Sequence, residues 1–191
     1  VTSSNTDAGN VSSGSGFGPR YIDAVIGVIK AYTTRVGNGA FPTELLNKIG
    51  EKVGYKGYEF GTVTRRKRRV GWLDLVLLRR SVEVNSINSL SLTKLDVLSG
   101  LSEIKVCVSY ELDGNEILYP PHSNYDHARC KPIYKTLDGW YEEIFGQTIY
   151  NKLPIEARTY IQFIQKALGV PIDLISTGPD RNQSIILKNI V

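Results

Sequence analysis

The sequence predicts an α/β fold with a mixed, mostly parallel sheet flanked by helices. Segments with apolar residues at helical spacing alternate with short β-branched segments, and this alternation is typical of α/β domains. The chain has 191 residues, which is enough for one domain with a sizeable core. Its 41% hydrophobic and 22% charged residues are usual for a globular protein.

The composition limits the environment and the partners. The net charge is +4, and much of the excess lies in Arg65–Arg69, which favours a local anion site over a broadly basic surface. No apolar run approaches the roughly 18 residues of a membrane-spanning helix, so we expect no membrane partner. We expect Cys107 and Cys130 to be reduced thiols of a cytoplasmic protein. The chain lacks methionine and begins at Val1, so we expect a piece of a longer protein.

The first elements are predicted from periodicity and from glycine and proline positions. Residues 1–19 are rich in glycine, serine and threonine, which fits a flexible linker or a phosphate-binding loop equally well. Apolar residues from Tyr21 to Ile29 predict a helix that begins near Pro19. The β-branched segment Ala31–Val36 predicts a strand, which the glycines of residues 37–39 end.

A second helix is predicted to begin at residues 41–44 and to bury Leu45, Leu46, Ile49 and Val53. Later elements follow in order: a buried helix over Leu73–Val84, strands over Ser89–Leu95 and Glu103–Leu112, a hairpin at Asp113-Gly114 into Glu116–Tyr119, a helix from Pro154 to Gly169, and strands over Val170–Ile175 and Ser184–Leu187. Residues 120–132 are expected to be irregular. His122, His127 and Asp126 in this segment could bind a metal, but such a set is more often solvent-facing.

The basic segment Arg65–Arg69 lies between a hydroxyl-rich run and the apolar residues that follow Trp72. Guanidinium groups match carboxylates and phosphates in bidentate geometry, and neighbouring hydroxyls and backbone N–H groups can complete an anion site. One hypothesis is therefore a loop that binds small anionic ligands. A solvated basic loop and a nucleic-acid or targeting patch are the two alternatives.

Two predicted strand ends carry polar residues. Lys94 and Asp96 end one strand, and Ser176-Thr177-Gly178-Pro179 ends another. Open α/β sheets bind ligands at the carboxyl ends of their strands. A carboxylate can accept two hydrogen bonds from guanine, and a lysine stem can lie across the base. The Lys94–Asp96 segment alone is weak evidence, because such residues more often have a structural role, but the two ends together favour a guanine site.

Seven motifs give a specific resemblance that covers the whole chain. They are VTSSNT at Val1–Thr6, GPR at Gly18–Arg20, KAYTTRVG at Lys30–Gly37, FPTEL at Phe41–Leu45, GWLDLV at Gly71–Val76, LTKLDVL at Leu92–Leu98 and STGPDR at Ser176–Arg181. In this order and spacing they resemble the adenylosuccinate synthetase family, in its C-terminal part of a little under half the enzyme.

The resemblance implies a fold and an activity. The fold would be the C-terminal portion of a P-loop-NTPase-like domain. The family joins IMP and L-aspartate, driven by GTP hydrolysis, and releases adenylosuccinate, GDP and phosphate, with Mg²⁺. It also implies a cytoplasmic homodimer at full length, with no nucleic acid partner. The family's catalytic base and acid, its glycine-rich phosphate loop and its Mg²⁺ ligands would lie outside this chain, which alone would be inactive.

The resemblance also implies residue roles, within a single domain. Residues 1–19 would form the IMP-phosphate region, 59–70 the aspartate loop and 89–191 the guanine-binding portion. IMP would contact Thr2 and Arg66. The remaining roles are as follows: aspartate at Thr62, Val63, Thr64, Arg65, Arg66, Lys67 and Arg68; GTP at Arg68, Lys94, Leu95, Asp96, Ser176, Thr177 and Gly178.

Three positions depart from the family pattern. Arg65 stands where many members have glycine, and Asp7 and Asn10 replace a more usual threonine and glycine near the IMP phosphate. Two other functions remain open on the residues alone. One is a nucleotide-binding fragment without catalysis, and the other is a basic nucleic-acid-binding module, which would bind with steep salt dependence.

Overall fold

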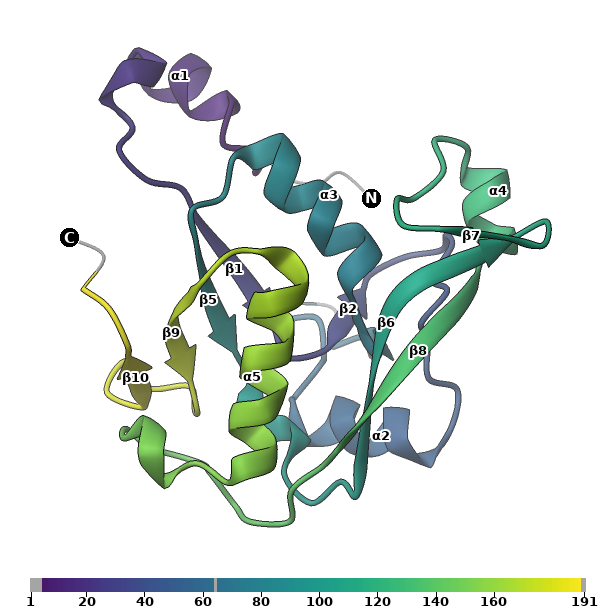
Figure 1. The fold of residues 1–191 in the computed structure, drawn as a ribbon, viewed down its shortest axis with the longest axis vertical. Helices are drawn as coiled ribbons and strands as arrows, with labels where there is room; N and C mark the ends of the chain where they lie inside the picture. Colours follow the sequence, from purple (N-terminus) through teal and green to yellow (C-terminus); the bar gives the residue numbers. More distant parts are fainter. Residues whose placement is uncertain (1–4, 64, 190–191) are drawn as a thin grey trace.

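The computed structural model describes residues 5–63 and 65–189, and its centre is a four-stranded sheet. The strand order is β1 (Ile26–Lys30), β5 (Ser89–Thr93), β9 (Ile172–Ser176) and β10 (Ser184–Ile186). The first three strands are parallel and β10 is antiparallel to β9. The predicted mixed, mostly parallel sheet is confirmed here (Figure 1).

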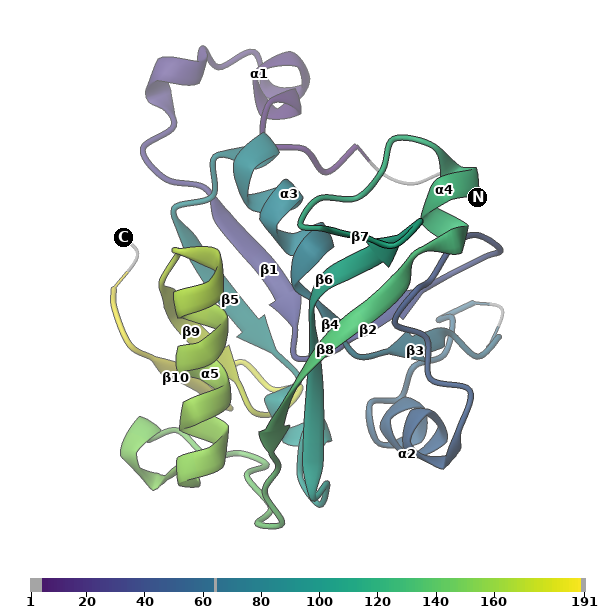
Figure 2. The ribbon, with the colours of Figure 1, turned by 45° about the vertical axis from the view of Figure 1, so that its right-hand side comes forward.

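Two further sheets lie among the described residues, and of their pairings only the hairpin at Asp113-Gly114 was predicted. In the larger one, β6 (Glu103–Leu112) pairs in parallel with β4 (Leu73–Asp74) and antiparallel with β7 (Asn115–Ile117) and β8 (Lys131–Asp138). Figure 2 shows β6 and β8 as a long ribbon that crosses beside the central sheet. The smaller sheet pairs β2 (Thr33–Arg35) with β3 (Arg69–Gly71). This pairing connects the segment after β1 to the end of the basic segment.

The helices begin and end at recognisable signals. They are α1 (Asn10–Ser15), α2 (Lys48–Lys56), α3 (Leu75–Asn85), α4 (Asn124–Arg129) and α5 (Ile155–Leu168), with short 3₁₀ turns η1 (Pro19–Tyr21), η2 (Leu95–Leu98) and η3 (Tyr150–Lys152). Asn47 and Asp74 accept backbone N–H groups at the starts of α2 and α3, and Gly169 ends α5 with a left-handed backbone. Within the described part of the chain, no helix is both long and apolar enough to span a bilayer.

The predicted helix over Tyr21–Ile29 is wrong, because residues 26–30 form strand β1. The β-branched residues that suggested a helical face instead pair in parallel with β5. Gly27 permits this packing, since a Cβ there would lie 2.7 Å from the Ile87 side chain. The strand is thus decided by its distant partner and not by local periodicity.

The second helix begins later than predicted, at Lys48 after the Asn47 cap. Val53 is buried as expected, but Leu46 is 89% exposed, because it precedes the helix. The segment predicted as irregular contains α4, capped by Ser123, and its end enters β8. The sequence of β8 is weakly apolar, and its pairing with β6 stabilises it.

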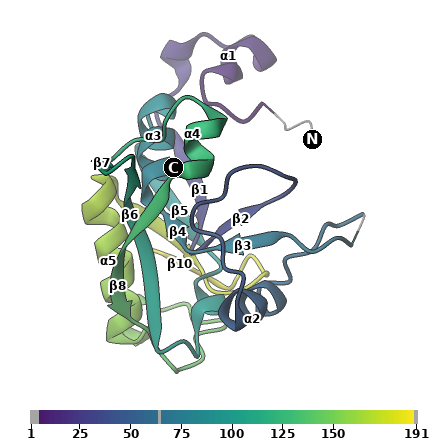
Figure 3. The same ribbon diagram turned by 90° about the vertical axis from the view of Figure 1, so that its right-hand side faces the viewer.

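The N-terminal segment lies apart from the sheets. Figure 3 shows α1 and the chain around it projecting away from the body, and α1 buries no residue. The hydrophobic core lies instead between the central sheet, α5 and the β6–β8 ribbon, around Leu90, Ile104 and Ile161. This core holds the carboxyl ends of β1, β5 and β9 at one edge.

Candidate functional site

The two predicted strand ends meet. Because β5 and β9 are parallel neighbours, Lys94 after β5 and Ser176 at the end of β9 lie at the same edge of the sheet. Both line a cavity of about 440 Å³, together with Asp96 and Gly178. We call this cavity the strand-end pocket. Pro179 of the predicted strand end also lines it, together with two aromatic side chains that sequence reasoning missed, Tyr58 and Phe145.

Lys94 and Asp96 face the strand-end pocket from an unusual turn. Lys94 has a left-handed backbone with φ 61°, which non-glycine residues rarely adopt, and η2 follows it directly. Its Nζ donates to the carbonyl oxygen of Gly57. Burial raises the pKa of Asp96, while Lys56 and Lys94 counteract this. Leu95 between them is fully buried, so its side chain belongs to the core.

The β9 end contributes two residues to the strand-end pocket and one behind it. Ser176 Oγ donates to the carbonyl oxygen of Gly178 at 2.8 Å, which closes a tight turn. Thr177 is fully buried and donates to the carbonyl oxygen of Gln147 at 2.8 Å. A Cβ at Gly178 would lie 2.3 Å from Gln183 Oε1, so a larger residue there would displace the Gln183 side chain. Thr177 therefore fixes the turn, and Ser176 and Gly178 form the pocket wall.

The segment of residues 62–68, which we call the basic loop, is the end of a narrow hairpin. Gly61 N donates to Arg66 O at 2.8 Å, and Arg65 N donates to Gly61 O at 2.9 Å. Thr62 and Val63 are exposed at its tip, and Thr64 lies outside the described residues. Arg65, where many family members have glycine, has φ 55°, and its guanidinium donates to Tyr58 Oη at 3.0 Å.

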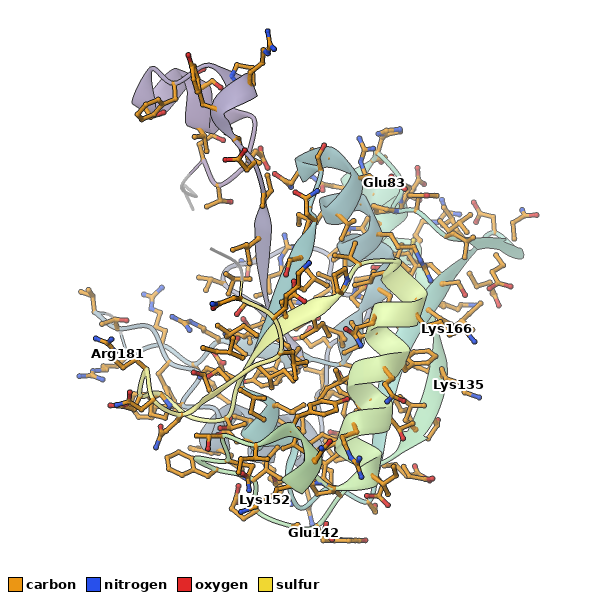
Figure 4. All side chains as sticks on the ribbon, turned by 60° about the vertical axis from the view of Figure 1, so that its left-hand side comes forward. Glu83, Lys135, Glu142, Lys152, Lys166 and Arg181 are labelled. Atoms are coloured by element: carbon orange, nitrogen blue, oxygen red, sulfur yellow. The ribbon has the colours of Figure 1, made fainter. Side chains whose placement is uncertain are left out.

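The cations of this stretch have separate partners. Lys67 lies over the Tyr55 ring at 5.2 Å, and Arg69 forms a bidentate pair with Glu44 at 2.5 and 2.7 Å. Arg68 turns inward to Glu59. Elsewhere, Figure 4 shows charged side chains of both signs projecting from different elements: Lys135, Lys152, Lys166, Glu83 and Glu142. The excess charge therefore does not form one uniform basic face among these residues.

A buried carboxylate that sequence reasoning missed organises the cations. Glu59 is fully buried and accepts hydrogen bonds from Lys30, Tyr32 and Arg68, and Lys94 lies 3.5 Å away. We call these five residues the Glu59 cluster. Burial alone would raise the pKa of Glu59, but the hydrogen bonds from Lys30, Tyr32 and Arg68 lower it to about 2. One signal was present in the sequence, since Glu59 is the single acidic residue between Glu51 and Asp74.

The Glu59 cluster joins the basic loop to the strand-end pocket. Lys94 belongs to both the cluster and the pocket wall, and Arg68 is the last residue of the loop. Burial lowers the pKa of Lys30, an effect that Glu59 opposes. Three cations around one carboxylate leave an excess of positive charge beside the pocket. Such an arrangement suits a ligand with a planar ring and an anionic tail.

The residues expected to contact IMP are only partly described. Thr2 lies outside the described residues, and Arg66 is in the basic loop. Asp7 and Asn10 line a separate hollow of about 870 Å³ between the N-terminal segment and β1. Ala8 N donates to Asn85 Oδ1 at 2.7 Å, which ties this segment to the end of α3.

Metal ligands do not gather in the described ranges. In residues 5–63 and 65–189, no group of three or more histidine, cysteine, aspartate or glutamate side chains could hold a metal ion. His127 is half-buried and contacts the Tyr110 ring, with centroids 5.8 Å apart, whereas His122 is exposed. Both cysteines are free and buried.

Known proteins match this chain over almost its whole length. The model of the family described as adenylosuccinate synthetase matches residues 1–185. Curated adenylosuccinate synthetases from Shewanella frigidimarina and Shewanella oneidensis are 55% and 54% identical to it over 190 and 188 residues. These matches cover 99% and 98% of this chain and 44% of each relative, so the chain spans less than half the length of these relatives.

A solved structure agrees with the sequence matches. The fully ligated adenylosuccinate synthetase from Plasmodium falciparum superposes with a TM-score of 0.94 at 42% identity, over 98% of this chain and 45% of that one. A cyanophage S-2L succinoaminodeoxyadenylate synthetase has a TM-score of 0.53 at 13% identity, which shows a shared fold alone. On the family model and on this identity over nearly every residue, the chain belongs to the adenylosuccinate synthetase family.

Proposed function

We propose that this chain is the C-terminal part of an enzyme that joins IMP and L-aspartate to form adenylosuccinate, with GTP converted to GDP and phosphate. One observation carries the proposal. Lys94, Asp96, Ser176 and Gly178, named from two distant motifs, line one pocket. The family membership supplies the reaction.

In this proposal the strand-end pocket holds guanine. The Asp96 carboxylate accepts hydrogen bonds from the ring N–H and the exocyclic amine of the base, a donor pair that adenine lacks. Tyr58 and Phe145 supply apolar surface for the ring. Phosphates of the nucleotide lie toward the excess positive charge of the Glu59 cluster.

The basic loop holds L-aspartate. Arg66 and Arg68 position its carboxylates so that its amino group can displace phosphate from the 6-phosphorylated IMP. Arg66 also contacts the IMP ribose, and Thr2 contacts the IMP phosphate. The base, the acid and the Mg²⁺ ligands lie in the other part of the enzyme, which acts as a cytoplasmic homodimer.

The test compares leucine variants at each of Arg65, Arg66, Lys67, Arg68 and Arg69 in the full-length protein that contains this chain. We expect Arg66→Leu to raise KM for aspartate and lower kcat, with little effect on GTP. Arg68→Leu is expected to impair both substrates. Arg69→Leu, at a cation outside the residues assigned to aspartate, is the matched control. Arg65→Leu and Lys67→Leu should have smaller effects than Arg66→Leu. Steady-state kinetics at fixed ionic strength give both constants, and five equal, mild effects would defeat the loop assignment.

A second assay examines the chain alone. The 191 residues should form no adenylosuccinate, because the catalytic groups lie elsewhere. Turnover by the pure chain at a rate above contamination would contradict this. If the chain is a nucleic-acid-binding module instead, its affinity for a DNA duplex should fall steeply as the salt concentration rises, and free nucleotides should not change that affinity.

A further inference from the structure

Three cationic side chains, those of Lys30, Arg68 and Lys94, surround the Glu59 carboxylate. Its Oε1 accepts from Tyr32 Oη at 2.6 Å and lies 3.5 Å from Lys94 Nζ, and its Oε2 accepts from Arg68 at 3.0 Å. Lys30 Nζ donates to both oxygens, at 2.8 and 3.0 Å. The partners come from β1, from the turn after it, from the end of β5 and from the basic loop.

Glu59 and its cationic partners differ in solvent exposure. The carboxylate is fully buried, whereas the Lys30, Arg68 and Lys94 side chains are 27%, 32% and 37% exposed. A ligand in the strand-end pocket therefore cannot contact Glu59 but can contact Lys94, which lines that pocket, while Arg68 is open to a ligand of the basic loop. Any effect of Glu59 on a ligand must pass through these cations.

We propose that Glu59 is a positioning residue that holds Arg68 of the basic loop and Lys94 of the strand-end pocket in one charged cluster, so that a ligand at either site increases the affinity for a ligand at the other. This inference rests on the proposed function, since it takes aspartate as the loop ligand and a guanine nucleotide as the pocket ligand. It adds a residue that belongs to neither binding motif.

The direction of the effect follows from charge and order. Three cations repel one another, and the single carboxylate holds them at fixed distances. A ligand that binds Arg68 keeps the loop against Glu59, which keeps the carboxylate in place for Lys94. The second ligand then meets a cluster that is already ordered and loses less conformational freedom on binding. Thermodynamic linkage makes the effect equal in both directions.

Two further features hold Tyr32 and Arg68 against Glu59. Gly57 has no room for a side chain, because a Cβ would lie 2.2 Å from Tyr32 Oη, so glycine lets the phenol reach Glu59. Arg68 N also donates to Glu59 O at 2.9 Å, so backbone and side chain hold the same two residues together. The low pKa of Glu59 keeps its charge throughout the physiological range.

The experiment measures the dissociation constant of GDP by calorimetry on the full-length protein, with IMP present, without and with saturating L-aspartate. GDP cannot phosphorylate IMP, so no turnover interferes. In the wild type we expect aspartate to tighten GDP binding about five-fold or more. In Glu59→Gln, which keeps the shape but removes the charge, we expect a ratio near one.

Glu44→Gln is the matched control, because Glu44 pairs with Arg69 in the same stretch but lies outside the Glu59 cluster. Its ratio should equal that of the wild type. Tyr32→Phe keeps the charge and removes one hydrogen bond, so an intermediate ratio is expected, and it serves if Glu59→Gln does not fold. A wild-type ratio of one, or equal ratios in Glu59→Gln or Tyr32→Phe and the wild type, would overturn the inference.

The wild-type assay separates this inference from the proposed function. If the full-length protein forms no adenylosuccinate from IMP, aspartate and GTP, the proposed function fails. If the full-length protein does form adenylosuccinate but Glu59→Gln or Tyr32→Phe leaves the ratio of GDP dissociation constants unchanged, only the inference about Glu59 fails.

Discussion

Glu59 and Asp74 are both buried carboxylates, yet their surroundings differ. Asp74 Oδ1 accepts the backbone N–H groups of Val76 and Leu77 at 3.0 and 3.3 Å, and Oδ2 accepts from Tyr110 Oη. Burial raises the pKa of Asp74, whereas cations lower that of Glu59. Asp74 is held by neutral donors alone, and Glu59 by three cations and the Tyr32 hydroxyl.

This difference separates an acid within the packed interior from one beside the strand-end pocket. The partners of Asp74 begin α3 and fill a small cluster with Cys107 and Cys130, so its hydrogen bonds serve packing. The cations around Glu59 keep part of their surface exposed. Burial alone therefore does not separate the two carboxylates, whereas the exposure of their partners does.

The largest expected effect is on stability at Asp74. Asp74→Ala removes a helix cap and leaves the buried Tyr110 hydroxyl without its acceptor, so we expect the free energy of unfolding to fall by about 2–4 kcal/mol. Nucleotide affinity should change less than about two-fold, because no ligand contact is lost. Urea denaturation and calorimetry measure the two quantities.

Ser123→Ala, which removes the cap of the exposed helix α4, is the control and should cost about 1 kcal/mol or less. A loss of nucleotide affinity in Asp74→Ala as large as that in Glu59→Gln would remove the contrast between the two carboxylates.

Acid should weaken the contribution of Glu59. Its folded pKa of about 2 lies below the ordinary value of 4.5, so its stabilisation is present above pH 4.5 and is lost as the pH falls toward 2. The full contribution is about 3 kcal/mol. Asp74, whose pKa is raised, changes stability with pH in the opposite sense.

Unfolding free energies of the wild type and of Glu59→Gln, measured from pH 6 to pH 3, test this. The difference between the two should shrink as the pH falls. A constant difference over this range would show that Glu59 is not held by cations in the folded protein.

A smaller effect is expected from Gly57→Ala. The new methyl group would displace Tyr32 from Glu59, with a loss of about 1–3 kcal/mol in the free energy of unfolding and weaker GDP binding. Gly54→Ala in α2 is the control, because the nearest atoms to a Cβ there lie at 3.6 Å. That change should be neutral or stabilising by up to about 1 kcal/mol. Thermal denaturation compares the two, and equal effects would count against the role of Gly57.

The smallest effect concerns Arg65. Its left-handed backbone costs roughly 1 kcal/mol, which Arg65→Gly would relieve, but the variant loses the hydrogen bond to Tyr58 and gains freedom when unfolded. The net change in the free energy of unfolding should stay within about 1 kcal/mol. A destabilisation above about 2 kcal/mol in urea would show that Arg65 has a larger structural role.

Features that depend on local signals were predictable from the sequence. Three such elements were confirmed. A glycine cap specifies the end of the helix from Pro154 to Gly169, alternating apolar residues specify strand β6, and the Asp113-Gly114 pair specifies the turn after it. The meeting of Lys94 and Ser176 also followed, because parallel strands share one carboxyl edge.

Features that depend on distant partners were missed. Residues 26–30 have an apolar pattern that a helix could share, and only the pairing with β5 decides for a strand. Strand β8 depends in the same way on β6. Glu59 is isolated among basic residues in the sequence, but its partners Lys30, Arg68 and Lys94 become apparent only when the fold brings them to it.

Nucleotide selection by Asp96 is the most direct test of the account. In the full-length protein, Asp96→Asn replaces an acceptor for guanine donors by an amide that can donate to the xanthine oxygen. A lost charged hydrogen bond costs roughly 1.5–3 kcal/mol, so we expect KM for GTP to rise by about ten-fold or more and xanthosine triphosphate to become a better substrate. Asp138→Asn, an exposed aspartate outside the pocket, should change neither value. An unchanged KM for GTP in Asp96→Asn would contradict the assignment of the strand-end pocket to guanine.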